Sequence, residues 1–134
     1  YPTSVPMKEL TKAEEELMQI LWKIGKGFVN DILAEIPDPK PAYNTVSTIV
    51  RILEKKGFVG HRAFGKSHEY YPLVSKKEYT KSYFGHFMKN YFGNSYREMV
   101  SFFTSEDNLS LKELEALKQA MAEEIIRKKI RENE

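Results

Sequence analysis

The chain has 134 residues, of which 41% are hydrophobic and 30% charged, and its net charge is +2. This length suits one compact domain or a small domain with an appendage, and the composition is not that of a disordered tail or a membrane-spanning protein. Because cysteine is absent, disulfides, thiolate zinc sites, iron–sulfur clusters and cysteine nucleophiles are excluded, which agrees with a reducing, cytoplasmic location.

Two short helices are predicted before residue 40. Thr11 and Glu14 form a capping box at the start of the first helix, and Gly25 and Gly27 end it. The second helix is predicted from apolar residues at positions i, i+3, i+4 and i+7, and Pro37 ends it. The apolar residues predict the buried sides of the two helices: Leu17, Met18, Leu21 and Trp22 in the first, and Val29, Ile32, Leu33 and Ile36 in the second.

The third predicted helix, residues 42–56, has two unlike faces, and Gly57 is predicted to end it. The apolar side chains at helical spacing predict a buried side: Val46, Ile49, Val50 and Leu53. The opposite side holds short polar or cationic side chains and no acid: Asn44, Ser47, Thr48, Arg51 and Lys55. This division predicts a helix that is held from behind and presents polar groups outward.

After Gly57 the hydrophobic period changes from that of a helix to two. This change predicts a strand over residues 58–64, a turn at 65–67 and a returning strand over 68–73. Three short helices followed by a β-hairpin are the winged helix-turn-helix plan. The sequence therefore predicts a mainly α fold with a small β-hairpin wing, in which residues 1–74 form the winged-helix domain.

Residues 75–134 are predicted to form a second, helical domain. An aromatic stripe from Tyr79 to Phe92 lies on one helix, which Gly93 and Asn94 end, and a short apolar helix follows. A capping box at Ser110 and Glu113 begins the last helix. Burying one large apolar side chain contributes roughly 1.5–3 kcal/mol, so leaving about ten of them exposed would cost more than a marginally stable domain can supply.

The sequence therefore predicts that this C-terminal domain dimerises around a two-fold axis. The large apolar side chains on its helices are the predicted dimer interface: Tyr83, Phe84, Phe87, Tyr91, Met99, Phe102, Phe103, Leu114, Leu117, Met121 and Ile125.

Positive charge is concentrated in the middle of the chain. Between residues 40 and 66, six basic side chains stand against one acid, Glu54. A local excess of this kind is typical of a surface that binds a polyanion, although a solvated lysine face is an equally ordinary reason for it.

Several segments in this order resemble the BlaI/MecI-type family of penicillinase repressors, over nearly the whole chain. The matching segments are Leu10 to Met18, Ile20-Leu21-Trp22, Asn44 to Gly57, Tyr70 to Ser75 with Glu78-Tyr79, and Leu109-Ser110 with Glu113-Leu114-Glu115. The resemblance implies a winged-helix DNA-binding domain, a helical dimerisation domain and repression at two-fold operators. It also implies a membrane-bound sensor peptidase as inducer, and the equivalent of the family's cleaved Asn–Phe bond falls at Phe102-Phe103.

The helix at residues 42–56 is then the predicted recognition helix, with its N-terminal part nearest the bases of the major groove. Asn44 can bond the N6 and N7 atoms of adenine, and Arg51 can bond guanine or a phosphate. Lys66 at the hairpin tip, with Arg62 and His68 on its arms, is predicted to contact the DNA backbone. The predicted DNA-binding residues are Tyr43, Asn44, Thr45, Ser47, Thr48, Arg51, Lys55, Arg62 and Lys66.

No catalytic, metal or cofactor site is predicted. His61 and His68 are expected to face each other across the hairpin and to add positive charge at lower pH, but no further ligand completes a metal site. No phosphate loop, nucleophile elbow or metalloprotease motif occurs, which excludes those enzyme classes. Two alternatives stay open: a winged-helix module that binds a protein without sequence-specific DNA binding, and an activator in place of a repressor.

Overall fold

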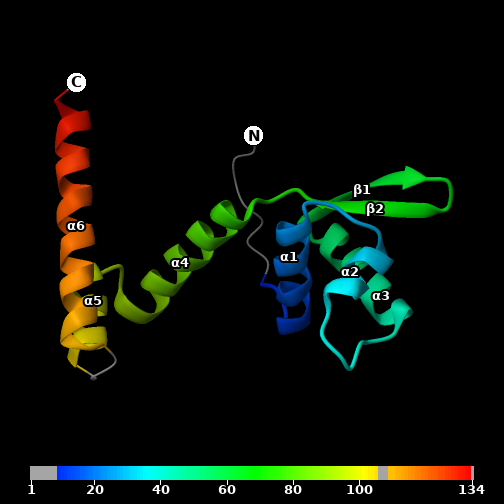
Figure 1. Ribbon diagram of the computed structural model, residues 1–134, viewed down its shortest axis with the longest axis horizontal. Coiled ribbons are helices and arrows are strands. Elements are labelled where there is room, and N and C mark those ends of the chain that lie inside the picture. Colours follow the sequence, from blue (N-terminus) through cyan, green and yellow to red (C-terminus); the bar gives the residue numbers. More distant parts are fainter. Residues whose placement is uncertain (1–8, 106–108, 134) are drawn as a thin grey trace. The chain divides into compact units, whose positions relative to one another are not determined.

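The computed structural model describes residues 9–105 and 109–133, which divide into two compact units, one ending at Phe84 and the other beginning at Gly85. The predicted order of helices and strands is confirmed, and the fold is mainly helical with a two-stranded hairpin after the third helix (Figure 1). The elements are α1 (Lys12–Ile24), α2 (Val29–Glu35), α3 (Tyr43–Lys55), β1 (Val59–Phe64), β2 (Ser67–Pro72), α4 (Lys76–Phe92), α5 (Tyr96–Ser105) and α6 (Leu111–Glu132).

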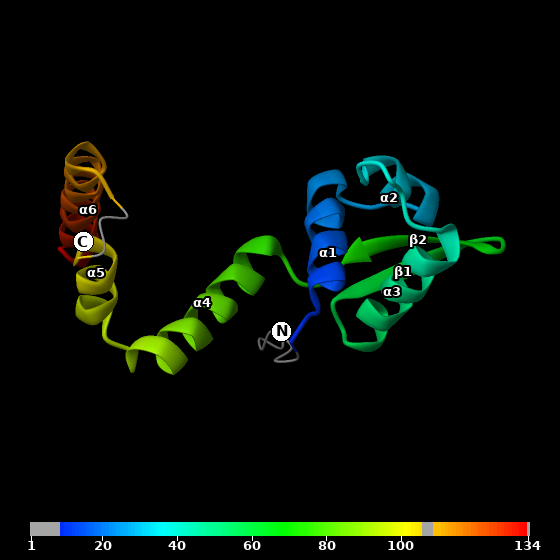
Figure 2. The ribbon, with the colours of Figure 1, turned by 90° about the horizontal axis from the view of Figure 1, so that it is seen from below.

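The first unit has one hydrophobic core, built from the apolar sides of its three short helices and the base of the hairpin. Helices α1, α2 and α3 gather around this base, and the hairpin tip extends beyond them (Figure 2). The side chains with almost no exposed surface are Phe58, Met18, Leu21, Ile32, Leu53, Val46, Val50 and Val59. The predicted stripes of the three helices therefore meet in one place.

Helix α3 ends one residue before the predicted position. Lys56 is the C-cap, and Gly57 follows with a φ of +87°, a conformation that favours glycine. The amide of Gly57 donates to the carbonyl of Glu54, and that of Phe58 donates to the carbonyl of Leu53, both over 3.0 Å. These bonds form a Schellman motif, which turns the chain from α3 directly into β1.

The hairpin is antiparallel, with Val59 opposite Pro72 and Phe64 opposite Ser67. Its turn has two residues, and the first, Gly65, has a φ of +63°, as two-residue hairpin turns require. Gly27 and Tyr70 exchange two backbone hydrogen bonds of 2.9 and 2.8 Å. The segment between α1 and α2 is thereby fastened to the hairpin, and the wing is tied to the helices at its base.

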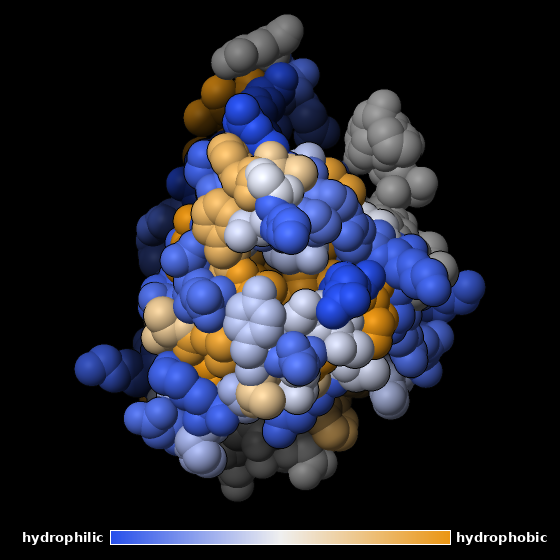
Figure 3. Space-filling model, turned by 90° about the vertical axis from the view of Figure 1, so that its right-hand side faces the viewer, coloured by the Kyte–Doolittle hydropathy of each residue, from blue (hydrophilic) through white to orange (hydrophobic). Residues whose placement is uncertain are grey.

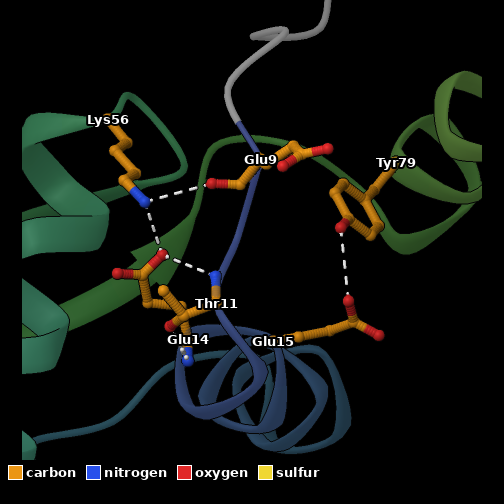
Figure 4. Close-up of polar contacts among 6 residues, drawn as sticks. All are labelled: Glu9, Thr11, Glu14, Glu15, Lys56 and Tyr79. Carbon is orange, nitrogen blue, oxygen red and sulfur yellow. Dashed lines mark hydrogen bonds and ion pairs between the residues drawn. The ribbon is translucent and has the colours of Figure 1, made fainter.

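An ion pair between a buried carboxylate and a partly exposed lysine connects the start of α1 to the end of α3 (Figure 4). Lys56 Nζ lies 2.6 Å from Glu14 Oε1 and also donates to the carbonyl of Glu9 over 3.1 Å. Thr11 and Glu14 form the predicted capping box. Burial raises the pKa of the Glu14 carboxyl, but the bonds from Lys56 and Thr11 outweigh it, and the net pKa lies below the usual value. Glu14 is therefore a buried carboxylate that stays charged.

The first turns of α4 belong to the winged-helix unit. The Tyr79 ring lies 5.6 Å from the Trp22 ring and 5.9 Å from the Phe58 ring, centroid to centroid, and its hydroxyl donates to Glu15 over 3.4 Å (Figure 4). The indole N–H of Trp22 donates to the carbonyl of Val74 over 2.8 Å. The aromatic stripe that begins at Tyr79 therefore starts against the core of the first unit, a contact that the sequence does not predict.

Alkaline pH is expected to weaken this attachment. Burial and the neighbouring Glu15 charge raise the pKa of Tyr79 from 10 to about 12, so folding favours the protonated hydroxyl. Its contribution is complete below about pH 10 and is lost as the pH rises through about 12. In thermal melts between pH 9 and 12, Tyr79→Phe should lose less stability than the wild type. Equal losses in the two proteins would contradict this role of the hydroxyl.

The second unit buries few of its side chains. Met88 is the one buried residue of α4, and no residue of α5 or α6 is buried within the part of the chain that the structure describes. The Phe92 ring lies 5.9 Å from Phe102 and 6.5 Å from Phe103, which packs the end of α4 against α5. No helix within residues 9–105 and 109–133 has both the length and the hydrophobicity needed to cross a bilayer.

The predicted dimer-interface residues are at least partly accessible in the single chain. Half-buried are Phe87, Met99 and Leu114, and exposed are Tyr83, Phe84, Tyr91, Phe102, Phe103, Leu117, Met121 and Ile125.

Candidate nucleic-acid interface

The exposed side of α3 carries the predicted polar and cationic residues. Val46, Val50 and Leu53 turn into the core, so the residues on the other side of the helix face outward. The predicted residues that lie exposed on α3 are Tyr43, Asn44, Thr45, Thr48, Arg51 and Lys55, and Ser47 is half-buried. No acidic side chain lies in the first turn of α3, the end that is predicted to approach the bases.

Two side chains of this face are oriented by hydrogen bonds within the helix. The Thr48 hydroxyl donates to the carbonyl of Asn44 over 2.8 Å, which leaves its oxygen lone pairs as acceptors. The Arg51 guanidinium donates to the Ser47 hydroxyl over 3.1 Å and, through Nε, to the Ser47 carbonyl over 3.4 Å, and it retains further N–H groups. Arg51 is therefore held along the helix surface with donors to spare for a base or a phosphate.

Not every cation of the basic stretch is available to a ligand. Lys40 Nζ donates to the carbonyl of Leu33 over 2.8 Å and also to that of Ile36, which satisfies open carbonyls at the end of α2. Lys56 is paired with Glu14 inside the unit. The other basic residues of the stretch, Arg51, Lys55, Arg62 and Lys66, are exposed and form neither of these contacts, and they are the ones assigned to DNA binding from the sequence.

The wing carries two exposed cations, and one of them lies against an aromatic side chain. The Arg62 guanidinium lies over the Phe64 ring, 5.2 Å from its centroid, and Phe64 packs edge-on against Phe28 with centroids 5.8 Å apart. Lys66 is exposed in the two-residue turn. The Phe28–Phe64 contact was not predicted, because it joins a loop before α2 to a strand that is far from it in the sequence.

A groove of about 600 Å³ lies between α3 and the hairpin. Four of the predicted DNA-binding residues line it: Tyr43, Ser47, Arg51 and Lys66. His68 and Tyr70 line it from β2, and Phe28, Asn30 and the acidic Asp31 line it from the start of α2. Figure 3 views the winged-helix unit from the side of the hairpin tip, where hydrophilic side chains surround smaller apolar areas in the hollows.

An outward polar helix, held by a three-helix core and flanked by a cationic hairpin, defines a winged-helix DNA-binding regulator. The penicillinase repressor family matches residues 10–123, and the chain belongs to this family. Its members are transcriptional regulators and not enzymes, and the domain that carries α3 and the wing is a DNA-binding domain.

Individual relatives match over nearly their full length. The methicillin resistance regulatory protein MecI of Staphylococcus aureus (strain N315) is 28% identical over 114 residues, which are 84% of this chain and 93% of the relative. The penicillinase repressor of Bacillus licheniformis is 27% identical over 122 residues, 90% of this chain and 95% of the relative. The solution structure of the DNA-binding domain of the repressor BlaI is 26% identical and matches 57% of this chain and 92% of its own, with a TM-score of 0.47.

Proposed function

We infer that the chain is a homodimeric transcriptional repressor that binds two-fold operator DNA, with α3 of each subunit in the major groove. The main support for this proposal is the outward face of α3, on which Asn44, Thr48 and Arg51 lie beside the cationic wing. An amide, a hydroxyl and a guanidinium are the groups that bond base edges, and Lys66 and Arg62 suit the phosphates beside them.

The unburied apolar surface of the second unit supports the homodimer. Leu117, Met121 and Ile125 of α6 expose 49%, 59% and 52% of their surface. Exposed apolar area of this extent is typical of an interface, and a second copy presents the same surface in a two-fold arrangement. A symmetric dimer in turn accounts for two recognition helices on one operator.

The interface is tested by substituting Met121 with glutamate. A charge in place of this apolar side chain should raise the dissociation constant of the dimer by about tenfold or more, since burying such a side chain contributes roughly 1.5–3 kcal/mol. Sedimentation equilibrium measures the change, and Ala116→Glu, which adds the same charge on the opposite side of α6, is the matched control. A stable monomeric wild type, or an unchanged dimer in Met121→Glu, would contradict the homodimer.

Sequence-specific binding is tested by selection from random double-stranded DNA with the full chain. We expect enrichment of one two-fold motif whose half-sites lie about one or two helical turns apart, at ~10 base pairs per turn. The enriched DNA is called the selected duplex below. A folded chain that enriches no motif would contradict operator binding and favour the alternative, a winged-helix module that binds another protein.

The wing is expected to contact phosphates and not bases. Lys66→Ala should therefore weaken binding to the selected duplex and to an unrelated duplex by similar factors. The slope of log K against log salt should fall by about one unit per subunit, because one fewer counterion-releasing contact is made. Fluorescence anisotropy at several salt concentrations measures this slope, with Lys12→Ala on α1 as control. A loss confined to the selected duplex would assign Lys66 to base recognition instead.

The sensor peptidase and the cytoplasmic location follow from the family resemblance and complete the proposal. The bond at the position of the family's cleaved Asn–Phe bond joins Phe102 to Phe103, a departure that disfavours cleavage there; it lies within α5, and both side chains are exposed. Cleavage there would separate α6 from the winged-helix unit and weaken a dimer built on α6. Incubation of the chain with a purified sensor peptidase, followed by mass spectrometry of the fragments, tests this step.

A further inference from the structure

Glu54 is an acidic residue at the C-terminal end of α3, where a negative charge is unfavourable. It is the one acidic residue between residues 40 and 66, and it lies in the last turn of α3. A negative charge there opposes the helix dipole and would repel a phosphate backbone bound along α3. Neither helix formation nor DNA binding by α3 alone accounts for a carboxylate at this position.

The structure gives Glu54 a partner on the wing. His61 Nδ1 of β1 lies 2.5 Å from Glu54 Oε2, and both side chains are about one-third exposed. The contact joins the recognition helix to the hairpin across the bend that follows Gly57.

The ring of His61 stacks on that of His68. Their centroids lie 4.1 Å apart and their planes differ by 9°. The hairpin register makes this contact because Ala63 is opposite His68 and His61 is opposite Tyr70, so the two histidines share one face. His68 also lines the groove that holds Ser47, Arg51 and Lys66. The contacts therefore run from Glu54 through His61 to a side chain at the DNA-facing groove.

We propose that Glu54 and His61 are positioning residues that hold His68 toward the DNA backbone, and that this histidine pair takes up a proton from solvent when DNA binds. The proposal rests on the proposed function and adds to it a means of control: operator affinity that rises as the pH falls.

The charges around the pair give the direction of the effect. From α3, Glu54 faces the pair and Arg51 lies nearby; from β2, Tyr70 contacts both rings, 5.9 Å from His61 and 6.1 Å from His68. Lys66 of the turn and Asp31 of α2 line the same groove, and the Asp31 carboxylate accepts a hydrogen bond from the backbone N–H of Phe28 over 2.9 Å. Burial, with a smaller contribution from Glu54, raises the pKa of Tyr70, so its hydroxyl is neutral in the physiological range.

Two cationic imidazoles at this separation repel each other, and Glu54, the carboxylate in contact with His61, offsets only one of them. A phosphate in the groove offsets the second. Because imidazole gains its charge as the pH falls through the neutral range, binding favours the protonated pair and affinity rises on acidification.

The test compares binding at pH 8 and pH 6 by fluorescence anisotropy, with the full chain and the selected duplex. The dissociation constant of the wild type should fall by about three- to tenfold between these pH values, since one proton changes affinity by at most tenfold per pH unit. The double variant His61→Gln/His68→Gln should lose most of this change. His86→Gln, the same substitution at the one remaining histidine, on α4, should behave like the wild type.

The positioning role has its own readout. Glu54→Gln removes a negative charge, so simple repulsion predicts tighter binding at both pH values. The proposal predicts instead that Glu54→Gln binds more weakly than the wild type at pH 6. It also predicts that the slope of log K against log salt steepens by up to about one unit per subunit from pH 8 to pH 6 in the wild type only. Circular dichroism at both pH values checks that each variant is folded.

The possible results distinguish failure of the pH-dependent inference from failure of the proposed function. Equal pH dependence in the wild type and the double variant, or tighter binding by Glu54→Gln at both pH values, overturns the inference and leaves the proposed function standing. A wild type that binds the selected duplex no better than an unrelated one overturns the proposed function instead.

Discussion

Alanine in place of Asn44 or Arg51 is expected to weaken binding to the selected duplex by about 1–3 kcal/mol per subunit, or roughly 5- to 150-fold. Both side chains are exposed on α3: the Asn44 amide offers a donor and an acceptor, and the Arg51 guanidinium offers paired donors. Since a dimer carries two copies, the two losses combine on one operator, and this is the largest effect on binding that we expect. Anisotropy titration of each variant against the selected duplex measures it.

Matched substitutions outside α3 separate recognition from a general loss of charge or polarity. Asn90→Ala on α4 and Arg97→Ala on α5 change exposed residues of the same types and should bind like the wild type. The Asn44 and Arg51 substitutions should also weaken binding to an unrelated duplex less than they weaken binding to the selected duplex. If they bind the selected duplex as the wild type does while folded, α3 is not the reading element.

Replacing Lys56 with methionine is expected to lower the free energy of unfolding by about 3 kcal/mol, a large share of the stability of a small domain. Glu14, only 5% exposed, would then keep a buried charge with no cation at the 2.6 Å contact. Urea denaturation at pH 7 measures the loss, and Lys55→Met, the exposed neighbour, should change stability by less than about 0.5 kcal/mol. Equal effects at the two lysines would contradict the importance of the pair.

The pH dependence of the unfolding free energy provides a second test of the Lys56–Glu14 ion pair. Because the pKa of Glu14 is lowered on folding, its contribution is present above about pH 4.5 and is lost as the pH falls below that value. Glu14→Gln should therefore be less stable than the wild type at pH 7 but lose less stability between pH 5 and 3.

The elements whose ends depend on local chemistry were predictable from the sequence. The capping boxes at Thr11 and Ser110 occur as expected, because the side chains that form them lie three residues from their partners. The exposed face of α3 followed from helical spacing alone. Gly57 marked the end of α3 to within one residue, since only the glycine position of the C-cap motif carries a strong sequence signal.

Contacts between distant segments were not predictable. The sequence placed Tyr79 in an aromatic stripe, and nothing local indicates that Trp22 and Phe58 would meet it. Lys40 and Lys56 count as basic residues in any sum of charge, yet one caps α2 and the other pairs with Glu14. The expectation that His61 and His68 face each other is confirmed by their stacked rings, whereas the contact of His61 with Glu54 depends on the bend after α3.

The measurement that tests the central claim most directly uses the absence of cysteine from the chain. Ala42→Cys places one thiol at the N-cap of α3, to which an iron chelate that cleaves DNA is attached. With α3 of each subunit in the major groove, the labelled dimer should cut the selected duplex at two places about one or two helical turns apart. Two results would contradict the account. One is equally strong cutting by a label attached at Gln19→Cys on α1, and the other is that the label at residue 42 does not cut the duplex although the protein is bound to it.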